Sequence, residues 1–149
     1  MDLSNLTQVV DYEITDNGFV FYDAQGNIPD PQKAYWDGSL WLNTYNGESL
    51  GGVPKIVNGD LSLNRYQGKT LAGLPTVVKG SLWLENYNGE SLEGLPEKVR
   101  WLFLDGYNGN DFNSLPKEYI KIWINGKRHT KAEIDDLQKT QKLKSILLD

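Results

Sequence analysis

Residues 38–50 of the chain read GSLWLNTYNGESL, and residues 80–92 read GSLWLENYNGESL. A related copy, GDLSLNRYQGKTL, occupies residues 59–71, so the repeat is 21 residues long. A fourth copy, LFLDGYNG at residues 102–109, starts one residue early because its leading glycine is missing, and residues 122–124 begin a fifth. Repetition at a fixed period of this length is typical of a solenoid, in which each copy stacks on the next.

Each copy has the features of one turn of such a solenoid. The Leu-x-Leu segment is short and alternating, which predicts a strand of about three residues with both leucines facing the core. The Asn-Gly or Gln-Gly pair that follows tolerates positive φ and predicts a sharp turn. On the return segment, Leu50 and Val53 should point into the core, and Pro54 suits an extended stretch without ladder hydrogen bonds. Gly59 and Gly80 then let the chain enter the next strand.

One part of the repeat carries a family resemblance. Val99, Leu102, Leu104 and Tyr107 match the spacing of the signature L-x-x-L-x-L-x-x-N. Residues 38–124 therefore resemble the leucine-rich repeat family, which implies a short parallel β-sheet with irregular return segments. Tyrosine stands where that family has asparagine, and the next apolar residue comes later than in the family. A generic β-solenoid is the alternative interpretation.

The two ends of this single domain are expected to be caps, at residues 1–37 and 127–149 around a repeat region at 38–126. In the first cap, Asp16-Asn17-Gly18 lies between two apolar segments and predicts a β-hairpin. Phe19 and Phe21 precede two leucines of the first copy by 21 residues. The second hairpin strand is therefore expected to form the first rung.

The second cap is expected to be helical. Thr130 and Glu133 have the spacing of a capping box, and the residues that follow give an imperfect apolar stripe. A helix from about residue 131 to 147 should close the last rung.

Composition limits the function. The chain has no cysteine, which excludes disulfides, thiolate metal sites and cysteine nucleophiles. The N-terminus lacks the features of a signal peptide, and no apolar stretch approaches the roughly 18 residues of a membrane span, so we expect a cytoplasmic protein without membrane contact. The net charge is −5, and residues 1–37 hold seven acids against one base. This charge disfavours nucleic acid as a partner.

The strongest functional signal is aromatic. The middle residue of each Leu-x-Leu strand should face outward on the sheet, and so should the flanking row that contains Trp101, which would gather four of the five tryptophans on one face. Each large ring can bury roughly 150–250 Å², so together they exceed the patch that a soluble monomer leaves bare. We expect another protein to dock there. The expected contact residues are Trp41, Trp83, Trp101, Phe103, Trp123, Glu85 and Asp105.

Other occupants of this face stay open at this point. The chain's own C-terminal helix or N-terminal segment could fold over it, a second copy could form a homodimer through it, or a carbohydrate could stack on it. A separate row of tyrosines, one per copy, is interpreted as structural stacking between rungs. These are Tyr45, Tyr66, Tyr87 and Tyr107.

The sequence does not favour an enzyme. His129 is the only histidine, so no catalytic triad or histidine-rich metal site is expected, and no cofactor is expected. Glu85 and Asp105 occupy equivalent positions in successive copies, and paired carboxylates beside aromatic rings suit a retaining glycosidase. The preferred function is a protein-binding module, such as a stoichiometric inhibitor of the phage-encoded anti-defence or immunity type. A carbohydrate-binding module or weak glycosidase is the alternative.

Overall fold

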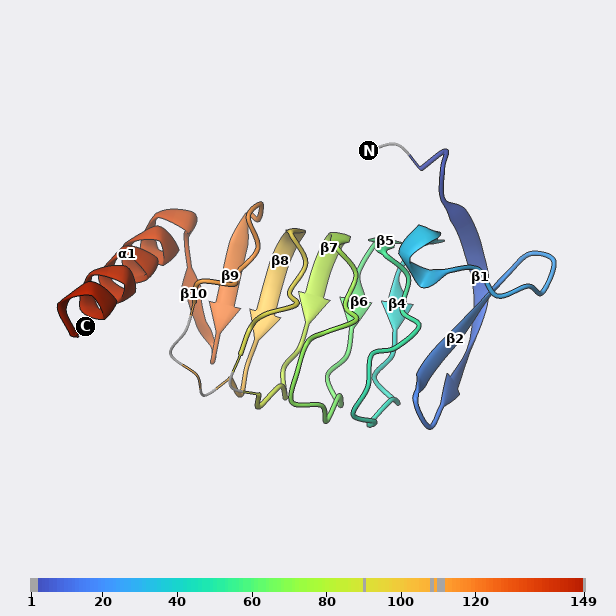
Figure 1. Ribbon diagram of the computed structural model, residues 1–149, viewed down its shortest axis with the longest axis horizontal. Helices are drawn as coiled ribbons and strands as arrows, with labels where there is room; N and C mark the ends of the chain where they lie inside the picture. The colour runs from blue at the N-terminus through green and yellow to red at the C-terminus, as the bar shows by residue number, and fades with distance from the viewer. Residues whose placement is uncertain (1–2, 90, 108, 110–111, 149) are drawn as a thin grey trace.

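The computed structural model is a parallel β-solenoid of about four turns with a repeat of about 21 residues. It describes residues 3–89, 91–107, 109 and 112–148, and side chains as far as residue 141. The strands lie side by side from the N-terminal hairpin to the single C-terminal helix (Figure 1). The fold is therefore a one-dimensional stack in which each turn covers the previous one.

The elements follow the repeat. The strands are β1 (Thr7–Thr15), β2 (Gly18–Asp23), β3 (Ala34–Asp37), β4 (Leu40–Trp41), β5 (Ile56–Asn58), β6 (Leu61–Ser62), β7 (Val77–Trp83), β8 (Lys98–Leu104), β9 (Lys121–Ile124) and β10 (Lys127–His129). The helices are a short 3-10 helix, η1 (Pro31–Lys33), and α1 (Lys131–Leu148).

The strands of successive turns pair in parallel and in register. The first leucine of each Leu-x-Leu segment lies opposite its counterpart in the next turn. These counterparts are Leu40, Leu61, Leu82, Leu102 and Ile122. The prediction that copies stack rung on rung is confirmed.

Each rung contains more strand than the sequence predicted. A first segment, β3 or β5, precedes the Leu-x-Leu segment, β4 or β6, with a short break at Gly38 or Gly59. In β7 and β8 the two segments join into one seven-residue strand, with an irregular register between Val78 and Ser81. The residues after each proline therefore take part in the sheet, and the return segment without ladder hydrogen bonds is shorter than expected.

The core runs through the middle of the stack. The paired leucines of each copy are at most 1% exposed from Leu40 to Leu104, and Leu50 and Val53 are buried as predicted. Buried residues from Val9 to Ile134 form one continuous hydrophobic cluster. Stacking therefore buries apolar side chains that no single copy could cover.

The tyrosine row belongs to this core, which confirms the structural interpretation. Tyr66 and Tyr87 are 2% and 1% exposed. The Tyr66 hydroxyl donates to the Thr70 carbonyl (2.5 Å), and the Tyr87 hydroxyl donates to the Ser91 carbonyl (2.6 Å). Tyr66 and Tyr87 thus each close the turn that follows them.

The glycine two residues after each tyrosine has a different role from the predicted one. Gly47, Gly68, Gly89 and Gly109 do not have positive φ, but a Cβ at any of them would overlap the hydroxyl of its own tyrosine. Positive φ occurs instead nearer the proline, at Gly52, Gly73 and Gly94. The Asn-Gly pair therefore makes room for the tyrosine ring, and the interpretation as a positive-φ turn was wrong.

The N-terminal hairpin is confirmed, but its place in the stack differs. Strands β1 and β2 pair antiparallel, and β1, not β2, pairs in parallel with β3. The second hairpin strand is thus not the first rung. Phe19 and Phe21 are nevertheless buried, and Phe19 packs on Tyr45 with ring centroids 4.5 Å apart.

At the C-terminal end, the helix begins at the predicted residue, but the segment before it has a different structure from the predicted one. The Glu133 N–H donates to the Thr130 hydroxyl (3.3 Å), and the Thr130 N–H donates to the Glu133 carboxylate (3.4 Å), which completes the capping box. Residues 127–129, placed by the sequence in the helical cap, form β10, which pairs antiparallel with β9.

Candidate functional site

The predicted aromatic face is present on the outer side of the sheet. Residues between the paired leucines align in one row across the stack, and the row reads Trp41, Ser62, Trp83, Phe103 and Trp123. Trp101 lies in the adjacent row, opposite Ser81 and Lys121. We call the five aromatic residues among these the aromatic ladder. Trp41 is 56% exposed and Trp101 is 37% exposed, whereas the other three rings are half-buried.

The ladder rings contact one another in a continuous series. Phe103 stacks on Trp83, with centroids 5.3 Å apart and planes inclined by 5°, and on Trp123, at 4.6 Å and 13°. Trp41 reaches Trp83 at 5.6 Å, and Trp101 meets Trp123 edge to face at 5.9 Å. Because both faces of Phe103 are covered by its neighbours, this ring presents its edge to solvent.

Ser62 interrupts the row without breaking the ladder. It is 2% exposed, and Trp41 and Trp83 make contact across its rung. Its hydroxyl donates to the side-chain carbonyl of Asn43 (2.6 Å). A small residue here lets two indoles from alternate rungs lean together.

Polar side chains on both sides of the ladder connect the rungs. On the entry side, the Asp60 N–H donates to the Ser39 hydroxyl (3.0 Å), and the Ser81 N–H donates to the Asp60 carboxylate (2.8 Å). On the exit side, the Asn64 N–H donates to Asn43 Oδ1 (3.2 Å). These bonds satisfy backbone groups where the strands end, so these residues stabilise the stack.

The two predicted carboxylates lie on the exit side. The backbone of Glu85 donates its N–H to Asn64 Oδ1 (3.1 Å). The Asp105 carboxylate accepts the N–H of Gly126 (2.9 Å) in the turn between β9 and β10. Asp105 is thus engaged in holding a turn, while both residues place negative charge along this side of the ladder.

The C-terminal helix packs on the end of the solenoid. Ile134 is buried in the core, Gln138 donates to the Phe112 carbonyl (2.5 Å), and Lys131 lies 5.6 Å from the ring centroid of Tyr119. Figure 1 shows α1 beyond β10, at the end of the row of strands. Over the described part of the chain, these contacts make α1 an end cap, and the ladder keeps its solvent exposure.

Glu85 and Asp105 remain the candidate acid–base pair beside the ladder, because the only histidine lies opposite Ile122 and outside the ladder row. The side chain of His129 is 14% exposed, and its Nδ1 lies 3.8 Å from Glu133 Oε2. Burial, together with the nearby phenols of Tyr66 and Tyr107, raises the pKa of Tyr87 to about 12. Within the described residues, no cluster of three or more His, Asp or Glu side chains could hold a metal ion.

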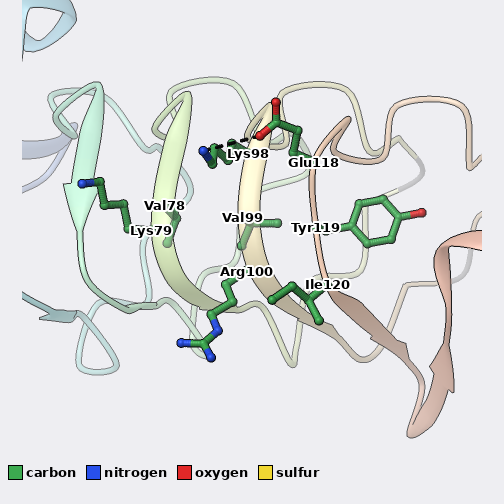
Figure 2. Close-up of a pocket in the computed structure, with 8 residues that line it drawn as sticks. All are labelled: Val78, Lys79, Lys98, Val99, Arg100, Glu118, Tyr119 and Ile120. Atoms are coloured by element: carbon green, nitrogen blue, oxygen red, sulfur yellow. Dashed lines mark ion pairs between the residues drawn. The ribbon is translucent and has the colours of Figure 1, made fainter. Parts of the chain in front are cut away.

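A hollow opens on the same face, over the first segments of β7 and β8 and the chain before β9 (Figure 2). Its volume is about 490 Å³. The charged residues that line it are Lys79, Lys98, Arg100 and Glu118. Ile120 adds exposed apolar surface, and the buried Val78 and Val99 lie beneath the hollow. Sequence reasoning missed this hollow because it identified no strand before each Leu-x-Leu segment.

Comparison of the chain with protein-family models, with curated proteins and with solved structures gives no match. The chain is therefore classified by its fold alone, as a β-solenoid with a repeat of about 21 residues, and no family is assigned. Among the residues that the structure describes, no helix has the length and apolar character needed to cross a membrane.

Proposed function

We propose that the chain is a protein-binding module that docks a partner through the aromatic ladder. The observation that carries this proposal is the continuous contact of five aromatic rings along one open sheet face. Tryptophan is enriched among residues that dominate the free energy of protein association, and solenoids present their sheets as binding surfaces.

Ring orientation favours a protein over a carbohydrate. Sugar rings stack on exposed aromatic faces, whereas Trp83 and Phe103 stack on each other with planes inclined by 5°. The exposed edges of these two rings and the half-buried ring of Trp123 form a surface on which apolar side chains of another protein can pack. Glycosidase chemistry with Glu85 and Asp105 has less support, because the Asp105 carboxylate already accepts a backbone hydrogen bond.

The mode of action follows from the same surface. A module of this size that docks firmly on a functional surface of its partner blocks it stoichiometrically, which is the proposed inhibitor role. The resemblance to leucine-rich repeats is consistent with partner binding on the sheet face. An intracellular location belongs to the same proposal.

The proposal is tested by capture of partners from a lysate with purified protein as bait. Trp83→Ala and Trp123→Ala should each reduce the captured partner by about tenfold or more, as expected for an interface residue that contributes at least 1.4 kcal/mol. Ile28→Ala is the matched control, because Ile28 is 64% exposed and lies outside the ladder.

Loss of folding would show instead that the rings serve packing alone. Trp41→Ala provides a second test in that case. Trp41 is the most exposed ladder ring and makes one ladder contact, so its removal should leave the protein folded. If a folded Trp41→Ala protein and a folded Trp123→Ala protein both capture the partner as well as the unchanged chain does, the ladder is not the docking surface.

A further inference from the structure

The charged side chains that line the hollow beside the ladder have a net positive charge. Lys79, Lys98 and Arg100 supply three positive charges and Glu118 one negative charge, which leaves +2. The whole chain carries −5. A positive hollow on a negative protein is a local feature that attracts anionic groups.

The cations come from neighbouring rungs. Val78 and Val99 lie opposite each other in the parallel register of β7 and β8, and Lys79 and Arg100 follow them directly. Adjacent strands are about 4.8 Å apart, so the two side chains border the same space. Lys98 forms an ion pair with Glu118 at 3.4 Å, at the opposite edge of the hollow from Arg100 (Figure 2).

Arg100 connects the hollow to the ladder, because it lines the hollow and contacts a ladder ring. The Arg100 guanidinium lies over the ring of Trp101, 5.5 Å from its centroid, and Trp101 in turn meets Trp123. Arg100 precedes Phe103 by three residues on β8, a distance of about 10 Å along an extended strand. A segment of a few residues laid along the strand can therefore reach both features.

The charges around the ladder distinguish between anionic partners. Glu85 and Asp105 lie on the exit side of the same rungs, opposite the hollow. A nucleic acid carries phosphates along its whole length and would meet these carboxylates, whereas a polypeptide can place its acids at one end only. Charge complementarity therefore favours an acidic stretch of polypeptide.

We infer that the hollow binds acidic side chains of the docked protein, so that the partner's docking segment combines a short acidic run with apolar residues that lie on the ladder. Carboxylates would accept hydrogen bonds from Lys79 and Arg100, and the apolar residues would cover the rings. This inference rests on the proposed function, because it assigns the chemistry of the partner that the ladder binds.

The test uses a fluorescein-labelled peptide in which a run of glutamates is followed by leucine and tryptophan, and a second peptide with glutamine in place of each glutamate. Fluorescence anisotropy with the full chain should show binding of the glutamate peptide about tenfold tighter than that of the glutamine peptide at low salt. Added salt should reduce this difference, because the hollow is open to solvent.

Charge reversal locates the effect. Lys79→Glu and Arg100→Glu should each remove most of the preference for the glutamate peptide, and the double variant should prefer a lysine version of the peptide. Arg65→Glu is the matched control, because it makes the same change in net charge at an exposed position outside the hollow. It should keep the preference for glutamate.

Several outcomes would overturn the inference. Equal binding of the two peptides, or equal loss of binding in Arg65→Glu, would show that the hollow selects no acids. Tighter binding of a single-stranded DNA oligonucleotide than of the glutamate peptide would assign the site to nucleic acid. Self-association that Lys79→Glu abolishes would assign it to the acidic hairpin of a second copy. If the ladder variants capture the partner as well as the unchanged chain does while the preference for glutamate persists, the proposed docking surface is wrong and the charge preference of the hollow stands, so the two failures are distinguishable.

Discussion

At the level of single residues, the repeat depends on a tyrosine and the glycine two positions after it. The Tyr66 ring folds back over its own turn and occupies the space where a Cβ at Gly68 would lie. Gly68→Ala should lower the free energy of unfolding by about 2–3 kcal/mol, because the overlap forces the ring or the turn to move. Urea denaturation followed by tryptophan fluorescence measures the change.

Gly51→Ala is the control for this prediction. Gly51 is exposed, has no positive φ, and would bring its Cβ to 3.2 Å from the nearest backbone oxygen, that of Asn17. A small shift of the hairpin turn can accept it, so the cost should stay well below that of Gly68→Ala. Equal costs at the two positions would show that the tyrosine does not determine the need for glycine.

The same tyrosines make the stability of the fold sensitive to alkaline pH. Burial holds the pKa of Tyr87 at about 12, against 10.0 in the unfolded chain. Between these pH values the unfolded state binds fewer protons, so the free energy of unfolding falls as pH rises. The contribution of this phenol is fully present below about pH 10 and is lost as pH rises through about 12.

Tyr87→Phe separates this effect from other alkaline changes. The variant lacks the titrating phenol, so it should lose less stability than the unchanged chain when urea denaturation at about pH 9 is compared with that at about pH 11.5. An identical loss in both proteins would mean that Tyr87 titrates at its ordinary pKa when folded.

At the level of elements, very short strands are stabilised by side-chain hydrogen bonds and by side-chain packing in addition to backbone pairing. Strands β4 and β6 contain two residues each, too few for a stable ladder alone. Ser39 and Asn43 extend the pairing on either side of β4 by accepting backbone N–H groups from the next rung. The leucines then seal the inner face, and the indoles cover the outer one.

Elements with a local signal could be predicted from the sequence, and those fixed by long-range contacts could not. The Leu-x-Leu strands, the hairpin turn at Asp16-Asn17 and the capping box of α1 each follow from a few adjacent residues. Strand β5 and the equivalent segments of the other rungs follow a proline, and no turn residues mark where they begin. They become strands because they pair with the neighbouring rungs.

The same distinction explains the prediction of the site. Alternation alone placed Trp41, Trp83, Phe103 and Trp123 on one face, because the strand period is two residues. The expectation that β2 forms the first rung rested on the 21-residue spacing between Phe19 and Leu40, whereas the strand that pairs with β3 is β1. The hollow depended on strand segments that were not predicted.

At the level of the whole molecule, the stack transmits stability only between neighbours. In a solenoid each turn contacts the turns before and after it, so damage at one end need not reach the other. Ile134 of α1 is fully buried and, among the described side chains of this helix, is the one that belongs to the core cluster. It therefore offers a way to loosen the C-terminal end alone.

Ile134→Asp places an uncompensated charge in this contact, at a local cost of about 3–5 kcal/mol. Hydrogen exchange should show loss of protection in α1, β10 and β9, while the amides of β3 to β7 keep theirs. Thr140→Asp adds the same charge at an exposed position of α1 and should leave the pattern unchanged. A uniform fall in protection from β3 to β9 would mean that four turns are too few to unfold separately, because the shared core then acts as one cooperative unit. Survival of the inner turns would instead leave the ladder from Trp41 to Phe103 assembled without its cap.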